Sequence, residues 1–268
     1  MVRSILRRFA SALPPSVFSR IEHELLVAGG RPLTAWGNVQ RPEASADVVK
    51  RRSVEMWEEG AWMTTTWLGR PIAQLPHDLV AMQELVWEQR PRVIVETGLA
   101  KGGSAVFLAD LLTTSGGGAV ISIDRVVADE VRSAIRAHPL GDKITIVEGD
   151  SVAPATVDTV RNLVGTETNV MVVLDSDHTR DHVRRELDAY SPLVPSGGWI
   201  VVFDGVLEWV AELGVRGRGG DKRWLTDSPL AAVRDFLQAN PEFSTSDRNH
   251  HLGATFAPGG LLRRSVRG

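Results

Sequence analysis

Cysteine is absent from this chain of 268 residues, and tyrosine occurs only once. Without cysteine, a disulfide framework, a thiolate metal site and a cysteine nucleophile are excluded, and a reducing compartment is compatible with the composition. No apolar run approaches the roughly 18 residues that a membrane span needs, and the basic N-terminal stretch lacks the apolar core of a signal peptide. We therefore expect a soluble, cytoplasmic protein without a membrane partner.

A strong charge of either sign is also missing, because the formal net charge is -3 and the pI is about 6.2. Such a chain has no bulk basic field for a phosphate backbone, so nucleic acid is not an expected partner. The length suits one α/β domain with an extension. We predict an N-terminal helical arm at residues 1–60 and a cofactor-binding domain at residues 61–268. Such arms often cover a pocket or mediate contacts in a homo-oligomer, which we expect here.

Short runs rich in β-branched residues alternate with segments of helical periodicity. Because the runs lack polar alternation, they resemble strands that are buried on both faces. The predicted strands are residues 92–96, 119–123, 144–148, 169–174 and 198–203. The predicted helices are residues 76–90, 103–113, 127–137, 153–165 and 179–190. This alternation predicts a doubly wound, mostly parallel, Rossmann-like α/β sheet, whose ligands bind beyond the carboxyl ends of the strands.

The segment ETGLAKGGS, residues 96–104, places three glycines between the first predicted strand and the next helix. Small residues there let the backbone approach a ligand and leave helix N–H groups free. The spacing differs from the G-x-G-x-x-G dinucleotide fingerprint. Glu96 lies two positions before the first of these glycines, where its carboxylate would accept a hydrogen bond from an ammonium group of the ligand.

Two further acids follow the second and third predicted strands. Asp124 is placed to accept from ribose hydroxyls, and Asp150 is placed near an adenine rim. Each acid alone is better explained as a helix cap or a turn residue. Together, acids at three successive strand ends favour S-adenosylmethionine as the cofactor. The predicted cofactor-binding residues are Glu96, Gly98, Gly102, Gly103, Ser104, Asp124 and Asp150.

Asp175 and Asp204 end the fourth and fifth predicted strands, which would be neighbours in a methyltransferase-like strand order. Their carboxylates would then face each other, and such hard oxygen ligands suit Mg²⁺ or Ca²⁺. A cation there would bind two neighbouring substrate hydroxyls and lower the pKa of the one that attacks. The same pair would alternatively hold the substrate diol directly.

The motif DSDH, residues 175–178, offers two candidates for the catalytic base. His178 could take the proton of the hydroxyl, since imidazole titrates near neutral pH. Asp177 is the alternative base or a helix cap, and the whole motif would also suit a plain strand-to-helix turn. An iron site would need His178 and His182 to converge with Asp175, but we read His182 as helix surface.

Eight tryptophans are available for contacts with a sugar ring or for core packing. Trp67, Trp87 and Trp199 lie in or beside predicted elements, where core packing is expected. Trp209 and Trp224 lie in the Gly- and Arg-containing segment 206–224, which suggests a mobile cover over the pocket. Those two are the candidate substrate contacts, with ordinary packing beneath the loop as the alternative.

Three longer stretches carry a resemblance to a known family. They are TTWLGRPIAQLPHDLVAMQELVWEQRPRVIVETGLAKGGSA (65–105), DSDHTRDHVRRELDAYSPLVPSGGWIVVFD (175–204) and HLGATFAPGGLLRR (251–264). Over roughly residues 60–264 the chain resembles the cephalosporin hydroxylase family, which also contains rhamnosyl and other sugar O-methyltransferases. The combination of the three stretches is specific to that family.

The resemblance implies a class I S-adenosylmethionine methyltransferase fold with a magnesium site. It also implies that Asp175 and Asp204 are metal ligands. The family pattern after the fifth strand is Glu-Asp, whereas this chain has Phe203 in place of the glutamate. One expected ligand is therefore missing. Three outcomes stay open: Asp177 substitutes for it, the metal keeps an extra water, or the site works as a metal-free base.

From the residues and the resemblance together, we expect an S-adenosylmethionine-dependent O-methyltransferase. Its substrate would be a small molecule, a hydroxyl of a deoxysugar on a glycosylated natural product of the kind made in antibiotic biosynthesis. One alternative is the hydroxylase that the family label suggests, with an iron site or a redox partner. Another is a non-catalytic accessory protein that binds S-adenosylmethionine and supports a tailoring enzyme.

Overall fold

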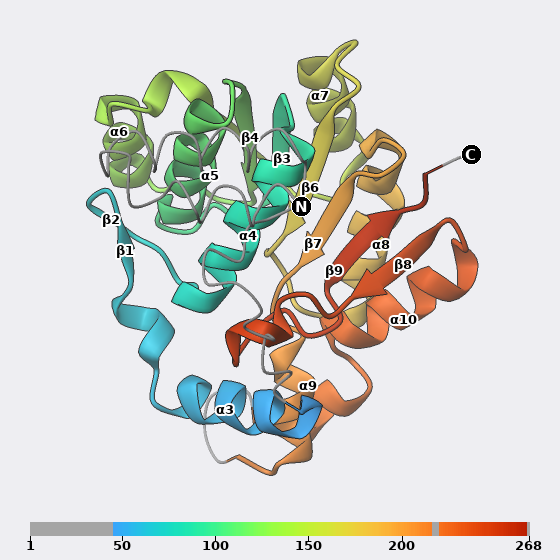
Figure 1. Ribbon diagram of the computed structural model, residues 1–268. Coiled ribbons are helices and arrows are strands. Elements are labelled where there is room, and N and C mark those ends of the chain that lie inside the picture. The colour runs from blue at the N-terminus through green and yellow to red at the C-terminus, as the bar shows by residue number, and fades with distance from the viewer. Residues whose placement is uncertain (1–44, 216–219, 267–268) are drawn as a thin grey trace, which may run out of the picture. The chain divides into compact units, whose positions relative to one another are not determined.

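The computed structural model describes residues 45–215 and 220–266 (Figure 1). Residues 1–44 of the predicted N-terminal arm lie outside the described residues, as does part of the predicted cover, residues 216–219. Within the described ranges, no helix combines the length and the apolar character that crossing a membrane requires.

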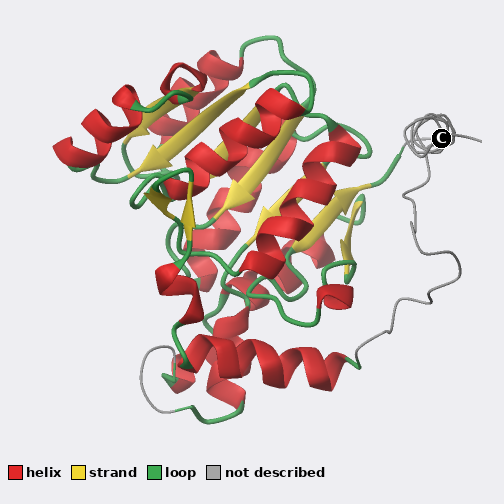
Figure 2. Cartoon of the chain, turned by 60° about the vertical axis from the view of Figure 1, so that its left-hand side comes forward, coloured by secondary structure: helices red, strands yellow, loops and turns green. Residues whose placement is uncertain are grey.

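A seven-stranded sheet forms the centre of the described chain, with the strand order β5-β4-β3-β6-β7-β9-β8 (Figures 1 and 2). The strands are β3 (Val93–Thr97), β4 (Ala119–Asp124), β5 (Ile144–Glu148), β6 (Val170–Leu174), β7 (Trp199–Val202), β8 (Phe243–Ser246) and β9 (Leu261–Arg264). The first five in chain order are parallel, whereas β9 pairs antiparallel with β7 and β8. The predicted doubly wound, mostly parallel sheet is confirmed.

Helices cover both faces of the sheet, as Figure 2 shows. One face packs against α4 (Pro76–Gln89), α5 (Gly103–Thr114) and α6 (Asp129–Ala137). The other packs against α7 (Pro154–Val164), α8 (Arg180–Tyr190) and α10 (Pro229–Ala239). Successive residues of a strand point to opposite faces, so Ile94 joins the first layer and Val95 the second. Burial on both sides explains why these strands lack polar alternation.

A third apolar cluster lies beyond the sheet, between α3 (Ala46–Glu58) and α9 (Val206–Glu212). Trp57 of α3 packs edge-on against Phe256, with ring centroids 5.1 Å apart. Short elements connect the rest: β1 (Thr66–Trp67), β2 (Arg70–Pro71), and the 3-10 turns Ala61–Thr64, Gly141–Lys143, Ser191–Leu193, Lys222–Leu225 and His250–Leu252. The first part of segment 206–224, which was predicted to be a mobile cover, is therefore the helix α9, whose apolar side packs in this cluster.

Three tryptophans, Trp67, Trp87 and Trp199, were expected to pack in the core. Trp199 is 2% exposed in the core, as expected, and Trp67 is partly buried against it. Trp87 is 52% exposed, so the expectation of core packing was wrong. The guanidinium of Arg90 lies 4.1 Å from the centre of the Trp87 ring, which gives that exposed ring a cation–π partner.

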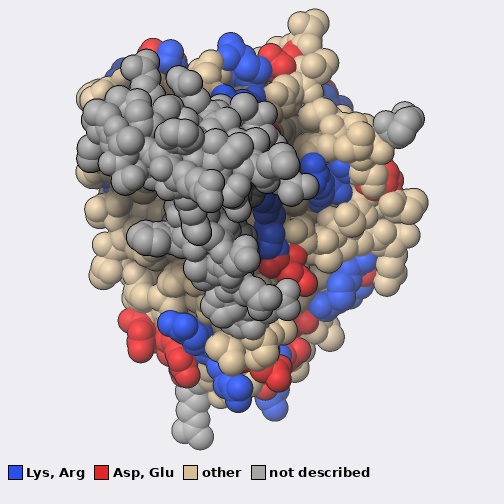
Figure 3. All heavy atoms as spheres, in the orientation of Figure 1, with Lys and Arg blue, Asp and Glu red and all other residues tan. Residues whose placement is uncertain are grey.

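Charges of both signs are interspersed on the face drawn in Figure 3, among the residues that are coloured there. Several charged side chains of the described residues form ion pairs between segments that are distant in the sequence, such as Arg180 with Asp235 at 2.6 Å. Exposed pairs of this kind contribute little to stability, typically about 0 to 1 kcal/mol. The stability of the fold therefore depends mainly on the apolar layers.

Two leucines on neighbouring helices test this dependence. Leu187 of α8 is fully buried in the second layer, whereas Leu163 of α7 is 47% exposed. We expect Leu187→Ala to lower the free energy of unfolding by about 2 to 5 kcal/mol, because it leaves a cavity. The same change at Leu163 should cost less than about 1 kcal/mol. Urea unfolding followed by circular dichroism measures both, and equal losses would contradict the layered core.

Candidate functional site

A cleft of about 290 Å³ opens at the carboxyl ends of the parallel strands. Its lining comes from the loops after β3, β4, β5 and β6, together with the start of α8. The lining residues are Gly98, Ala100, Ile123, Asp124, Arg125, Gly149, Asp150, Ser151, Asp175, Ser176, Asp177 and His182. The predicted location of the ligand site, beyond the strand ends, therefore coincides with a cavity.

Gly98 lets two neighbouring strand ends approach each other closely. It has a positive φ of 92°, and a Cβ atom there would lie 2.0 Å from the backbone oxygen of Asp175. Any side chain would therefore push β3 and β6 apart. Gly102 and Gly103 allow other segments to pack closely against this loop. A Cβ atom at Gly103 would lie 2.0 Å from the backbone oxygen of Pro71, and one at Gly102 would meet Ile135.

This packing argues against the direct cofactor contacts predicted for Gly102, Gly103 and Ser104. None of the three is among the cleft-lining residues: Gly102 packs against α6, Gly103 packs against β2, and Ser104 lines a separate small cavity with Glu96. Gly98 and the neighbouring Ala100 supply the loop's surface in the cleft. Gly98, at the start of the glycine segment, thus forms part of the cleft surface. Gly102 and Gly103, at its end, allow close packing inside the protein.

Asp124 and Asp150 both line the cleft, and both also stabilise the backbone of their loops. Oδ2 of Asp124 accepts from the backbone N–H groups of Leu99, at 3.0 Å, and Ala100, at 2.9 Å. Asp150 accepts from the N–H of Val152 at 3.1 Å. The two explanations weighed from the sequence are therefore compatible, because a carboxylate has further acceptor positions for a ligand.

Glu96 lies behind the cleft. It is fully buried, accepts from the Ser122 hydroxyl through Oε2, and has an Oε1 atom without a hydrogen-bond partner. Burial raises the pKa of Glu96 to about 7, while hydrogen bonds from Ser104 and Ser122 oppose the rise. Together with Asp175, it lines a small separate cavity. A direct contact with a ligand ammonium group is not supported by this position.

Asp175, His178 and Asp204 come together at the ends of β6 and β7. One ligand atom from each lies within 4.8 Å of the others, and Nε2 of His178 is 3.1 Å from Oδ2 of Asp204. Because β6 and β7 are neighbours, the two aspartates following them are adjacent. Asp204 has a positive φ of 56°, a conformation that aspartate tolerates better than most residues.

The two carboxylates of this cluster resist ionising together. Burial, followed by the nearby charge of Asp204, raises the pKa of Asp175 well above its ordinary value, although Gln74 donates to Asp175 at 2.8 Å. Burial also raises the pKa of Asp204, and His178 opposes that rise. Charges buried near each other need pairing or a cation.

Phe203 supplies no third acid to this cluster. Its ring is 5% exposed in the first core layer and lines the same small cavity as Gln74 and Asp175. The position that the resemblance assigns to a glutamate is therefore used for apolar packing. Gln74, which the sequence analysis did not single out, occupies the neighbouring position and hydrogen-bonds the carboxylate of Asp175.

Asp177 forms the turn that begins α8. Its Oδ1 accepts from the N–H of Thr179 at 2.9 Å and from the Thr179 hydroxyl at 2.6 Å. Burial acts to raise the pKa of Asp177, but these hydrogen bonds and the neighbouring histidines outweigh it, so the pKa is lowered overall. A carboxylate of lowered pKa is a weaker base.

His182 does not join His178, and the two-histidine iron site is not formed. Its Nε2 lies 3.0 Å from Oγ of Ser151 and 3.4 Å from Oε1 of Glu186, toward the cofactor cleft. The side chain is 12% exposed, so the interpretation of His182 as solvated helix surface was wrong. The spacing of His182 and Glu186, four residues apart on one helix, was the available signal for this pair.

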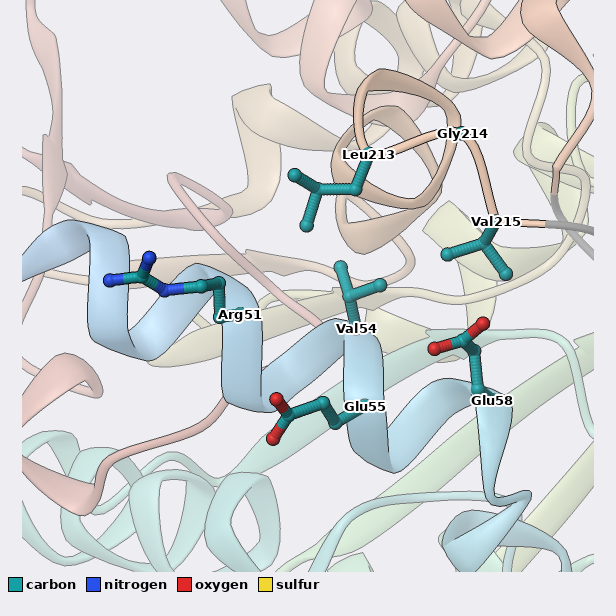
Figure 4. Close-up of a pocket in the computed structure, with 7 residues that line it drawn as sticks. All are labelled: Arg51, Val54, Glu55, Glu58, Leu213, Gly214 and Val215. Atoms are coloured by element: carbon teal, nitrogen blue, oxygen red, sulfur yellow. The ribbon is translucent and has the colours of Figure 1, made fainter.

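The predicted substrate contacts lie in the third cluster. Trp224 is 8% exposed and packs there, which argues against a contact with substrate. Trp209 is partly buried on α9, with its ring 6.5 Å from that of His250. Another cavity, of about 460 Å³, lies between α3 and the end of α9 (Figure 4). Val54, Leu213 and Val215 face one another across it, and none of its lining residues also lines the cleft at the strand ends.

Comparison with solved structures identifies the fold. A structure of CmcI with Mg and SAM has a TM-score of 0.55 and 19% sequence identity, covering 79% of this chain and 84% of the other. A Bacillus cereus O-methyltransferase in complex with SAH has a TM-score of 0.50 at 17% identity, covering 81% and 90%. The fold is that of the class I S-adenosylmethionine-dependent methyltransferases.

Sequence comparison narrows this class. The model of the family Rhamnosyl O-methyltransferase/CmcI matches residues 59–265, so the chain belongs to that family. A rhamnosyl O-methyltransferase of Mycobacterium leprae is 30% identical over 207 residues, covering 76% of this chain and 84% of the relative. One of Mycobacterium tuberculosis is 28% identical over 209 residues, covering 76% and 80%. The resemblance inferred from the sequence is confirmed.

The burial of Glu96 leads to a prediction about pH. Its folded-state pKa of about 7 exceeds the ordinary value of 4.5, so the folded protein holds the proton more tightly than the unfolded chain. The carboxyl group therefore costs stability as the pH rises from about 4.5 to about 7, and the cost persists above that range. Without cofactor, Glu96→Gln should be more stable than wild type at pH 8, by at most about 3 kcal/mol.

Chemical denaturation of both proteins at several pH values measures this difference. The gain should disappear toward pH 4, where Glu96 is protonated in both folded and unfolded states. A Glu130→Gln variant provides the control, because Glu130 is exposed on α6. A constant difference between the Glu96 variant and wild type across this pH range would contradict the assigned burial cost.

Proposed function

We propose that this protein is an S-adenosylmethionine-dependent O-methyltransferase that methylates a sugar hydroxyl of a glycosylated natural product. The observation that carries the proposal is the position of Asp175, which lines the nucleoside-sized cleft and also belongs to the cluster with His178 and Asp204. A methyl donor bound in the cleft and an acceptor hydroxyl bound at the cluster would therefore both lie next to Asp175. Holding two reactants in this way is a large part of catalysis.

Cofactor binding would use the loops along the cleft. Asp124 would accept from the ribose hydroxyls, and Asp150 would accept from the adenine amino group. Gly98 and Ala100 would form the surface near the methionine part. When bound, the cofactor supplies an activated methyl group on its sulfonium, so the protein's own tasks are alignment and proton removal.

The cluster residues fit a divalent cation such as Mg²⁺. Asp175 and Asp204 offer hard oxygen ligands, and they are close enough to share one ion. When bound, a cation would lower the pKa of an alcohol hydroxyl that it contacts. Because Phe203 provides no third carboxylate, water would complete the coordination. Without a cation, the same two carboxylates would hold the diol by accepting its hydrogen bonds.

His178 would remove the proton from the acceptor hydroxyl. Its Nε2 lies 3.1 Å from Asp204, which would orient the ring and stabilise the imidazolium that forms. Asp177 is the weaker candidate, since Thr179 occupies its Oδ1 with two hydrogen bonds. Asp177 would instead keep α8, and with it His178, in place.

The relatives named as rhamnosyl O-methyltransferases support a deoxysugar as the acceptor. Trp209 is the remaining candidate for stacking on the sugar, because α9 starts directly after Asp204 and Gly205. Homo-oligomer formation and a cytoplasmic location stay predictions.

One observation favours a second candidate, a non-catalytic protein that binds S-adenosylmethionine. Phe203 removes an acid from the position where the family pattern has one. Mass spectrometry of a glycosylated acceptor after incubation separates the candidates. A gain of one CH₂ indicates methyl transfer, a gain of one oxygen indicates the hydroxylase alternative, and tight cofactor binding without any product indicates the accessory role.

The acid pair leads to a prediction for turnover. Asp204→Asn keeps a residue that tolerates positive φ but removes the charge. We expect methyl transfer to fall by at least about 100-fold, because His178 loses its charged partner. Affinity for S-adenosylhomocysteine, measured by calorimetry, should stay within about threefold, since Asp204 does not line the cleft. Full turnover in this variant would remove the cluster from the proposal.

Ligand stabilisation tests the cofactor and the cation together. S-adenosylmethionine should raise the melting temperature of the full chain, because it binds the folded state. EDTA should lower turnover if Asp175 and Asp204 hold a cation, and added Mg²⁺ should restore it. Nicotinamide cofactors and 2-oxoglutarate with iron provide the negative controls. The cofactor proposal fails if neither S-adenosylmethionine nor S-adenosylhomocysteine changes the melting temperature.

A further inference from the structure

A buried carboxylate joins two loops at one end of the cleft. Glu186 of α8 is fully buried, and its Oε1 accepts from the hydroxyls of Ser151, at 2.5 Å, and Ser176, at 2.6 Å. Ser151 follows β5, Ser176 follows β6, and both line the cleft. Because the same oxygen accepts from both hydroxyls, Glu186 fixes the position of one loop relative to the other.

His182 lies one helical turn before Glu186 and completes this network. Oγ of Ser151 donates to Glu186, so it accepts from the Nε2–H of His182, 3.0 Å away. This arrangement fixes the orientation of the ring through the network. Among the described residues, Nδ1 of His182 has no hydrogen-bond partner, although the ring lines the cleft.

The neighbours of His182 indicate which end of the cleft it faces. The carboxylate of Glu186, 3.4 Å from Nε2, raises the pKa of His182, burial opposes the rise, and the carboxylates of Asp177 and Asp150 add to it. A favoured imidazolium would carry a proton on Nδ1 as well as on Nε2. Ser151, whose Oγ lies 3.0 Å from Nε2 of His182, directly follows Asp150, and both His182 and Asp150 line the cleft. The ring therefore lies at the end of the cleft where the proposed function places the adenine edge.

We propose that His182 recognises the purine base of the cofactor and that Glu186 is the positioning residue that aims it. The inference rests on the proposed function, because it takes the cleft to hold S-adenosylmethionine. Adenine presents an amino donor next to a ring-nitrogen acceptor, which match Asp150 and the Nδ1–H of His182 respectively. Hypoxanthine reverses this pattern, with a carbonyl oxygen and a ring N–H, and would meet both groups with the wrong polarity.

A role limited to folding predicts something different. If Glu186 only held the loops together, its loss would weaken every nucleoside ligand to the same extent. The loop after β5 also has an independent tether, because the Tyr190 hydroxyl donates to the backbone oxygen of Ser151 at 2.6 Å. The loop should therefore keep its position when the charge of Glu186 is removed, while the orientation of His182 changes.

Calorimetric titration of the full chain with S-adenosylhomocysteine and S-inosylhomocysteine separates the two roles. Wild type should prefer the adenosyl compound. The ratio of the two Kd values should fall by roughly tenfold in Glu186→Gln and in His182→Ala, which each remove one oriented hydrogen bond. It should be unchanged in Glu130→Gln, the same substitution at an exposed position of α6.

An equal loss of affinity for both compounds in Glu186→Gln and His182→Ala would overturn the inference and leave the proposed function intact. Circular dichroism checks the fold of each variant. If Glu186→Gln does not fold, His182→Ala decides alone, since its side chain lies at the cleft surface. If neither compound binds wild type, the cofactor assignment itself fails, and the inference fails with it.

Discussion

The close approach of β3 and β6 is the constraint on which the site depends. Gly98 lies against the backbone of Asp175, where any Cβ atom would be 2.0 Å from an oxygen. The same contact brings the glycine loop to the side of the cleft that Asp175 shares with the acid cluster. β7 then continues the sheet and adds Asp204. One backbone contact therefore determines how far the cleft at the strand ends lies from the cluster of Asp175, His178 and Asp204.

Much of this arrangement could be predicted from the sequence, because it follows from local periodicity. The five apolar runs became parallel strands, and acids placed directly after them had to meet at one edge of the sheet. Asp124, Asp150 and Asp175 were found in this way, and Asp204 was correctly placed beside Asp175. These inferences needed only the direction of the strands and the position of each residue at a strand end.

Features that depend on contacts between distant segments could not be predicted in this way. Glu96 has the right position in the strand, but the packing of α5 and β4 buries it behind the cleft. Gly102 and Gly103 serve internal packing, which a glycine pattern alone does not distinguish from ligand access. Gln74 reaches Asp175 across 101 positions in the chain, and nothing in its local sequence indicates that partner.

Phe203 has a consequence for how this site could change over time. Its ring lines a small cavity together with Leu79, Met82 and Phe107, and the acids Glu96 and Asp175 line the same cavity. A glutamate in place of Phe203 would add a third carboxyl group beside Glu96 and Asp175, where ionising a carboxyl group is already unfavourable. It would also leave empty the space that the aromatic ring occupies. Because the surrounding residues fit the phenylalanine, placing a glutamate at this position would require changes in several of them as well.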